Sequence, residues 1–348
     1  MRAFRPKEIS GRGILHLHPN LKPNNPVAIT INQTLIDAGI QYRKDLLTMP
    51  VAQLAEVAQF MTIKTGVQGK IIGGILNTNA ELRPYKTDKN VQTDGTTIEP
   101  YESENYLGDV VKEFDPNAIL GTLYTEITAK KPSEREIARM VALGMAAKVG
   151  EALYDELFTA VRNVAGTTTH DLFDGFSTLA AKAIIAGTLS AAKKNYQDLT
   201  ETTITTSNCG EVLKAAYRNC NKLFKKKANV FLYLPTSILE MYEDWYQVEY
   251  GTAPWNAGFQ QRKLVGSSEK CTFVPLANME DQDYMFFSVS DNMQILVDQE
   301  SDKEIARIRE CDNPKAVQFF MMSYFGTGYD NLDKAFINVL EFTTESDS

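Results

Sequence analysis

The sequence predicts an α+β protein, and two observations support this class. Amphipathic helical patterns dominate between residues 133 and 250, whereas short apolar runs bounded by turn residues follow residue 258. The chain has 348 residues, of which 43% are hydrophobic and 23% are charged. This length and composition allow a large core and two domains.

Charge and hydropathy exclude two broad classes of protein. A net charge of −8 and a pI near 5.2 disfavour a nucleic-acid reader, which needs a clustered basic surface. The apolar runs, such as Val230 to Leu234, are far shorter than the roughly 20 residues that span a bilayer. The basic N-terminus lacks the apolar segment of about 7–15 residues found in secretory signals, so we expect a cytoplasmic protein.

The N-terminal third of the chain predicts an arm, a short helix and a hairpin. Residues 1–34 are rich in Pro and Asn, which indicates an extended arm, and apolar residues recur at helical spacing over 45–61. Residues 66–106 hold several glycines and threonines and the tight-turn signal Asp94-Gly95. The segment is expected to be either disordered or a protruding hairpin ordered by a partner. Strands of about 12 residues would reach roughly 40 Å, which favours contact with a neighbouring subunit.

A long helix is predicted next. Ser133 and Glu136 form a capping-box pattern, and strong helix formers continue to residue 163, so a helix over 133–163 would be about 45 Å long. Two further helices are expected within 170–227, the first of them capped by Asp171.

The remainder of the chain reads mainly as strands. Residues 229–235 predict a buried strand, and a helix is expected to begin at Thr236 or Ser237. Further strands are expected at 271–276, 284–289, 293–297, 305–309, 317–325 and 336–342. Asp291-Asn292 is the expected hairpin turn between the second and third of these, and Gly326-Thr-Gly328 the expected turn between the last two.

Motifs for nucleotide binding fail on inspection. Gly66-Val-Gln-Gly69-Lys70 comes nearest to a phosphate-binding loop, but that loop has four residues between its glycines and Ser or Thr after the lysine. Ile71 occupies the latter position. We interpret the glycines as the base of the hairpin.

Metal and hydrolase chemistry also lack a constellation. His16 and His18 have no carboxylate or cysteine at a supporting spacing, and His170 is the remaining histidine. The four cysteines Cys209, Cys220, Cys271 and Cys311 show no C-x-x-C spacing, so we expect buried thiols. The sequence predicts no cofactor, no metal and no catalytic residue. Carboxylates brought together only by the fold remain open as an alternative.

Two clusters have a structural and a functional interpretation. The basic run is Lys222, Lys225, Lys226 and Lys227. We favour a helix C-terminus, where the dipole attracts cations, over a contact with DNA. The aromatic cluster is Tyr242, Trp245, Tyr246, Tyr250 and Trp255. It is more typical of a core, although its position beside the loop 251–258 is compatible with a subunit interface.

Several segments and their order resemble a known family. They are Tyr106–Pro116 running into the helix at Ser133, and Val230–Tyr242 with Asn256–Phe259 and Cys271–Pro275. With the arm, the hairpin and the final strands, they resemble the HK97-fold major capsid proteins of tailed bacteriophages over nearly the whole chain. These are loose patterns that indicate a fold family and do not form a strict motif.

The resemblance implies a domain organisation, which assigns a role to each part of the chain. The expected parts are an N-terminal arm and short helix (1–65), an E-loop (66–106), a peripheral domain (107–165 and 300–348) with a spine helix (133–163), and an axial domain (166–299).

The resemblance also implies a structural function. Such subunits assemble in the host cytoplasm as hexamers and pentamers, and form the icosahedral shell of a virion around packaged double-stranded DNA. Implied partners are a separate scaffolding protein, a portal and possible decoration proteins, with no membrane. The candidate subunit-contact residues are Lys70, Arg83, Lys86, Lys89, Asp94, Trp255 and Asn256. Some members crosslink a lysine to an asparagine, but no motif here identifies such a pair.

Two alternatives stay open. An encapsulin-like nanocompartment shell shares the fold but encloses a cargo enzyme. An enzyme with a spatially assembled site would be a small oligomer instead of a shell.

Overall fold

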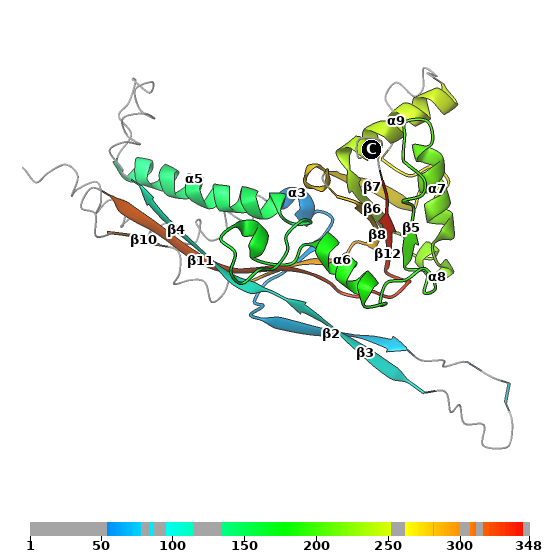
Figure 1. Ribbon diagram of the computed structural model, residues 1–348, viewed down its shortest axis with the longest axis horizontal. Coiled ribbons are helices and arrows are strands. Elements are labelled where there is room, and N and C mark those ends of the chain that lie inside the picture. Colours follow the sequence, from blue (N-terminus) through cyan, green and yellow to red (C-terminus); the bar gives the residue numbers. More distant parts are fainter. Residues whose placement is uncertain are drawn as a thin grey trace, which may run out of the picture.

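The computed structural model shows helices, two five-stranded sheets and a separate two-stranded hairpin among the residues that it describes (Figure 1). Those residues are 54–77, 82, 84–85, 95–114, 134–251, 262–280, 282–298, 307–310 and 316–343. The α+β class predicted from the sequence is confirmed.

The first sheet is organised by one long strand. Its members are β1 (Thr62–Lys64), β4 (Tyr106–Phe114), β9 (Met293–Val297), β10 (Arg307–Glu310) and β11 (Val317–Tyr329). β11 pairs antiparallel with β4, β9 and β10, and β1 joins β9 in parallel. Figure 1 shows α5 (Glu134–Asp155) lying along β4 and β11. Every residue of β9 is buried, as expected for a strand covered on both faces.

The second sheet carries the other helical layer. Its strands, in spatial order, are β5 (Tyr196–Asp198), β12 (Ile337–Glu341), β8 (Tyr284–Val289), β6 (Val230–Pro235) and β7 (Cys271–Leu276). The helices α7 (Cys209–Asn219), α8 (Lys222–Lys225) and α9 (Thr236–Tyr250) pack against it through one apolar cluster. The strand and helix predicted around residue 235 are thus confirmed.

Two apolar cores follow from the alternation of side chains along β8. Phe286 points into the larger core, which contains residues of both sheets and of the segment after α5. Phe287 points the opposite way, into the core beneath α7, α8 and α9, where it lies 5.9 Å from the ring of Tyr217. The second sheet is therefore buried on both faces.

The hairpin consists of β2 (Lys70–Asn77) and β3 (Thr97–Glu104), which pair antiparallel. Of the two alternatives for residues 66–106, the described residues show the hairpin, with strands of 8 residues that are shorter than expected. Figure 1 shows it projecting away from both sheets.

The long helix is shorter than predicted. α5 ends at Asp155, whereas the sequence suggested residue 163. Beyond it, the carbonyls of Leu157 and Phe158 accept hydrogen bonds from the backbone N–H groups of Phe176 and Ser177, at 3.1 and 3.2 Å. These N–H groups begin the next helix, α6 (Phe176–Ile185), so the tertiary contact replaces continuation of α5.

Asp171 does not cap α6, as had been expected. It lies in the short 3-10 turn η1 (Thr169–Asp171), where it forms a capping box with Thr168. Gly175 precedes α6 because a side chain there would lie 2.3 Å from the carbonyl oxygen of Phe158.

The predicted hairpin between residues 284 and 297 is wrong. β8 and β9 have the predicted bounds, but they belong to different sheets. Asp291 and Asn292 therefore turn the chain from one sheet to the other.

The predicted turn at Gly326-Thr-Gly328 is also wrong. These residues continue β11 and pair with β9. Positions 326 and 328 are glycines because the base of the hairpin approaches the strand closely there.

Other expectations fall partly or wholly outside the described residues. Of the helix expected over 45–61, the described part contains α3 (Ala55–Ala58), and β1 begins at Thr62. The arm over 1–34 and the loop tip at 252–261 lie outside. β12 pairs within the second sheet, although residues 300–348 were assigned to the peripheral domain.

Candidate assembly surfaces

The hairpin has two different faces. Directly opposed residues of an antiparallel pair point to the same face, and the register pairs Lys70 with Glu104 and Leu76 with Ile98. We call the face that carries the even-numbered residues of both strands the outer face. The opposite face carries Tyr101, which packs against the larger core, and the buried Ser103.

The outer face exposes three large apolar side chains. The side chains of Ile72, Leu76 and Ile98 are 67%, 60% and 68% exposed. Leu76 and Ile98 are a cross-strand pair, and Ile72 lies two pleats along the same face. Single exposed apolar residues are ordinary, but three on the same face of a projecting hairpin suit a protein-contact surface.

Asn105 holds the base of the hairpin. Its buried amide Oδ1 accepts from the Gly69 N–H and its Nδ2 donates to the Val67 carbonyl, both at 2.6 Å. Gln68 Nε2 donates to Asp298 Oδ2 at 2.6 Å, which ties the base to the end of β9. The hairpin is thereby fixed to the first sheet at its root.

Two glycines of β11 allow the hairpin base to lie directly on the first sheet. A Cβ on Gly326 would lie 2.4 Å from the Glu104 carbonyl oxygen and 2.7 Å from Asn105 Cα. A Cβ on Gly328 would lie 2.4 Å from Ser103 Oγ. Because backbone atoms cannot rotate aside, glycine is required at 326 for this approach.

Lys70 is the predicted contact residue that falls within the described residues. Its Nζ forms ion pairs with Glu102, at 2.8 Å, and with Glu104. Hydrogen bonds to Glu102 and then Glu104 raise the pKa of Lys70. The ammonium is therefore an ion-pair partner of both carboxylates on the outer face. The other candidates lie outside the described residues: Arg83, Lys86, Lys89, Asp94, Trp255 and Asn256.

Glu104 connects the hairpin to the segment after α5. It accepts hydrogen bonds from Lys70 and from the Tyr106 hydroxyl, which lower its pKa. Burial, and then the bond to Glu104, raise the pKa of Tyr106 to about 12. The Arg162 guanidinium lies 4.4 Å from the centre of the Tyr106 ring, and the Arg162 N–H donates to Asp174 Oδ1 at 3.0 Å. The hairpin base and this segment therefore share a polar network.

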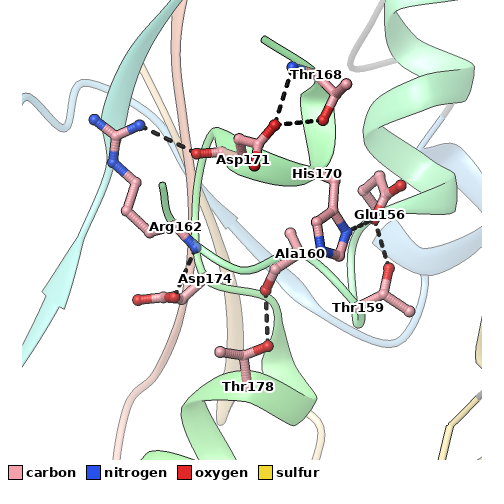
Figure 2. A network of polar contacts seen from close by, with 9 residues as sticks. All are labelled: Glu156, Thr159, Ala160, Arg162, Thr168, His170, Asp171, Asp174 and Thr178. Carbon is pink, nitrogen blue, oxygen red and sulfur yellow. Dashed lines mark hydrogen bonds and ion pairs between the residues drawn. The ribbon is translucent and has the colours of Figure 1, made fainter. Parts of the chain in front are cut away.

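Figure 2 shows how that segment is held between α5 and α6. The Asp171 carboxylate accepts from the N–H and the hydroxyl of Thr168, at 3.1 and 2.6 Å. Arg162 Nη1 donates to the Asp171 carbonyl at 3.2 Å, and Thr178 Oγ1 donates to the Ala160 carbonyl at 2.7 Å. These bonds fix the junction between the two helices.

A histidine and a carboxylate meet in the same region (Figure 2). His170 Nδ1 lies 2.7 Å from Glu156 Oε2, which also accepts from Thr159 Oγ1 at 2.6 Å. The pair links the turn after α5 to η1, so we interpret it as structural. No group of three His, Cys, Asp or Glu residues within the described ranges could hold a metal ion.

The cysteines inside the described ranges behave as apolar core residues. Cys209, Cys220 and Cys271 are buried free thiols, as predicted, and Cys311 lies outside those ranges. Burial raises the pKa of Cys209 and of Cys220 to about 12, so neither is a reactive thiolate at neutral pH. No described helix has both the length and the apolar character of a membrane span.

Comparisons with known proteins identify the fold. No protein-family model matches the chain, and no curated protein matches it. A chain of the satellite phage P4 procapsid superposes with a TM-score of 0.54 at 11% identity, covering 85% of this chain and 99% of that one. The chain has the fold of phage capsid subunits. This is the HK97-type fold that the sequence resembles.

Two further solved structures show the same fold. The capsid of the empty GTA particle gives a TM-score of 0.54 at 11% identity, covering 82% of this chain and 96% of that one. The cyanophage A-1(L) capsid gives 0.52 at 13% identity, covering 85% and 92%. The similarity extends over most of each matched capsid chain, so it concerns the whole fold.

Sequence reasoning found the hairpin but missed its contact face. Ile72 and Leu76 share a face because side chains alternate along a strand, but the placement of Ile98 beside them depends on the register, which the sequence does not specify.

Proposed function

We propose that the chain is a major capsid protein. It self-assembles as hexamers and pentamers into an icosahedral shell that encloses packaged phage DNA. The observation that carries the proposal is the fold, which matches three capsid structures over 82–85% of this chain. A shell protein has no need of a catalytic constellation, and the function lies in its surfaces.

In this proposal each part of the fold takes a capsid role. β2 and β3 form the E-loop, and α5 is the spine helix of a peripheral domain built on the first sheet. The second sheet with α7, α8 and α9 forms the axial domain. By sheet membership we assign β9 to the peripheral domain and β12 to the axial domain, which amends the boundaries expected from the sequence.

The hairpin is suited to bind a second copy of the chain. Its outer face presents Ile72, Leu76 and Ile98 to solvent, while Asn105 and Gly326 fix its root on the first sheet. A contact element that is already ordered loses little conformational entropy on binding. Each subunit can thus offer a preformed apolar arm to its neighbour.

The proposal includes partners and a location. A separate scaffolding protein, a portal and possible decoration proteins would act with the chain, which assembles in the host cytoplasm and resides in the virion. The acidic balance, a net charge of −8, suits a container that does not adhere to its DNA.

A matched pair of variants tests the role of the outer face. Ile98→Asp places a charge among the exposed apolar side chains, and Thr97→Asp places the same charge on the opposite face of the same strand. We expect Ile98→Asp to remain folded but to form no particles, because its carboxylate would be desolvated in the contact. Thr97→Asp should assemble as the native chain does.

The measurements are sedimentation velocity and negative-stain electron microscopy of the chain co-expressed with its scaffolding protein. Uniform particles that are empty or contain DNA support a capsid, whereas uniform particles that contain a protein cargo support the encapsulin-like alternative. A native chain that stays a small oligomer with its partners present contradicts the proposal. Equal assembly of the two variants contradicts the role of the outer face.

A further inference from the structure

The solvent face of α9 is acidic. Glu240, Glu243 and Asp244 follow one another at spacings of three and one residues, so they share the face opposite to the buried Tyr242 and Trp245. All three carboxylates are exposed. Among the described residues none of them forms an ion pair. Neighbouring like charges destabilise a helix, so the stripe is unfavourable for the isolated subunit.

The end of α7 and the short helix α8 are basic. Arg218, Lys222 and Lys226 are exposed, and within the described ranges their side chains form no ion pair. The remaining lysines of this run have internal contacts. Lys225 Nζ donates to the Arg218 carbonyl, and Lys227 Nζ lies 4.3 Å from the centre of the Phe336 ring. Lys225 and Lys227 are therefore used within the subunit, whereas no contact in the described residues accounts for the charges of Arg218, Lys222 and Lys226.

The two charged surfaces lie apart on one subunit. The first residues of α7 contact α9, since Cys209 Sγ donates to the Ile238 carbonyl at 3.6 Å, and α8 follows the far end of α7. Eleven helical residues span about 16 Å, which exceeds the Debye length of about 8 Å at physiological salt. Figure 1 shows α9 and α8 at opposite ends of this helical layer. In the described part of the chain, no ion pair joins the two surfaces of one subunit.

We propose that the acidic stripe of α9 (Glu240, Glu243 and Asp244) docks on the basic surface of α7 and α8 (Arg218, Lys222 and Lys226) of a second copy of the chain. The charges are complementary and equal in number. Because the two surfaces differ, the contact is head-to-tail, and repetition of such a contact closes a ring when the rotation allows it. The inference rests on the proposed self-assembly, and it names the surfaces that would join subunits within a hexamer or pentamer.

Charge reversal tests the contact directly. The acid-reversed variant carries Glu240→Lys, Glu243→Lys and Asp244→Lys, and the base-reversed variant carries Arg218→Glu, Lys222→Glu and Lys226→Glu. Each alone juxtaposes like charges, so we expect the protein concentration needed for assembly to rise roughly tenfold or more. The chain with all six substitutions restores opposite charges and should assemble within about threefold of the native concentration.

A mixture of the two variants gives a sharper result. The acid-reversed chain has two basic surfaces and the base-reversed chain has two acidic ones, so they can only alternate. An alternating ring closes with six members but not with five. We expect an equimolar mixture to form hexamers without pentamers, and hence no closed shells, by electron microscopy and native mass spectrometry.

Controls separate the failure of this contact from the failure of the proposed function. A variant with Lys193→Glu and Glu201→Lys changes two exposed charges outside both surfaces and should assemble normally. Circular dichroism and thermal unfolding confirm that each variant is folded. If the native chain forms no shell, the proposed function fails and the contact with it. If the native chain assembles and the single reversals assemble equally well, the shell stands and this contact is overturned.

Discussion

The clearest test of the architecture is the substitution Gly326→Ala. The added methyl group would lie 2.4 Å from the Glu104 carbonyl oxygen and 2.7 Å from Asn105 Cα. Both are backbone atoms, so the base of the hairpin must move away from β11. This displacement should loosen the hairpin while leaving both cores intact.

The magnitude follows from the contacts at the base. Overpacking of a close contact costs about 1–3 kcal/mol. Displacement also strains the hydrogen bonds that Asn105 makes with Gly69 and Val67, each worth about 0.5–1.5 kcal/mol net. We expect the free energy of opening the hairpin to fall by about 2–4 kcal/mol, which corresponds to roughly 30- to 700-fold lower protection.

Hydrogen exchange measured by mass spectrometry provides the assay. Peptides from β2 and β3 should lose protection in Gly326→Ala, while peptides from β6 and β8 should keep theirs. Gly144→Ala is the matched control, because a Cβ at this exposed position of α5 meets no atom within 4 Å. This control should be neutral or stabilising by up to about 1 kcal/mol.

One outcome would refute the reasoning. If Gly326→Ala keeps native protection in β2 and β3, the hairpin base does not lie on β11 as described. Loss of protection throughout the molecule would also contradict it, since the cores would then depend on the hairpin.

Three further predictions follow from the core, the hairpin base and the thiols. Phe286→Ala should lower the free energy of unfolding by about 3–5 kcal/mol in denaturant titrations, whereas the half-exposed Leu223→Ala should change it by less than about 1 kcal/mol. Asn105→Ala should lower the hydrogen-exchange protection of the hairpin amides about as Gly326→Ala does. Unchanged exchange would contradict the role of Asn105 in holding the base of the hairpin. Burial raises the pKa of Cys209 and Cys220 from 9.0 to about 12, so an unfolded chain releases these protons first as the pH rises. Stability should therefore fall above about pH 9, and replacing both residues with Ala should lessen the fall between pH 8 and pH 10; an unchanged slope would contradict this cause.

Local patterns predicted strands well and their partners poorly. The predicted bounds 271–276, 284–289 and 293–297 coincide with β7, β8 and β9, because each strand is an apolar run between turn residues. Which strands pair depends on contacts between distant residues, so the placement of β8 and β9 in different sheets left no local signal.

Glycines and helix ends misled the prediction for a related reason. Gly326 and Gly328 have the composition of a turn, yet they serve a close approach between strands. The helix-forming residues after Asp155 favour continuation of α5, yet the carbonyl groups of Leu157 and Phe158 accept hydrogen bonds from the first N–H groups of α6. In both cases a distant segment overrides the local preference.

The candidate surfaces were predictable to different degrees. The hairpin followed from its glycines and turn signal, but its apolar face required the register. The acidic stripe on α9 was readable from the spacing of Glu240, Glu243 and Asp244 once the helix was predicted. Its proposed partner surface could be recognised only from the structure, which places α8 at the far end of α7 from α9.

Asn292 stands where the chain crosses between the two sheets, and it joins two such crossings. Its carbonyl accepts from the Asp330 N–H at 2.7 Å, and its Oδ1 accepts from the Asn331 N–H at 2.8 Å. The connections β8–β9 and β11–β12, which both pass between the sheets, are therefore hydrogen-bonded to each other beside the core that the sheets share. The two sheets of the subunit therefore cannot move relative to each other without opening that core. In the proposed shell, curvature would therefore have to arise at the contacts between subunits.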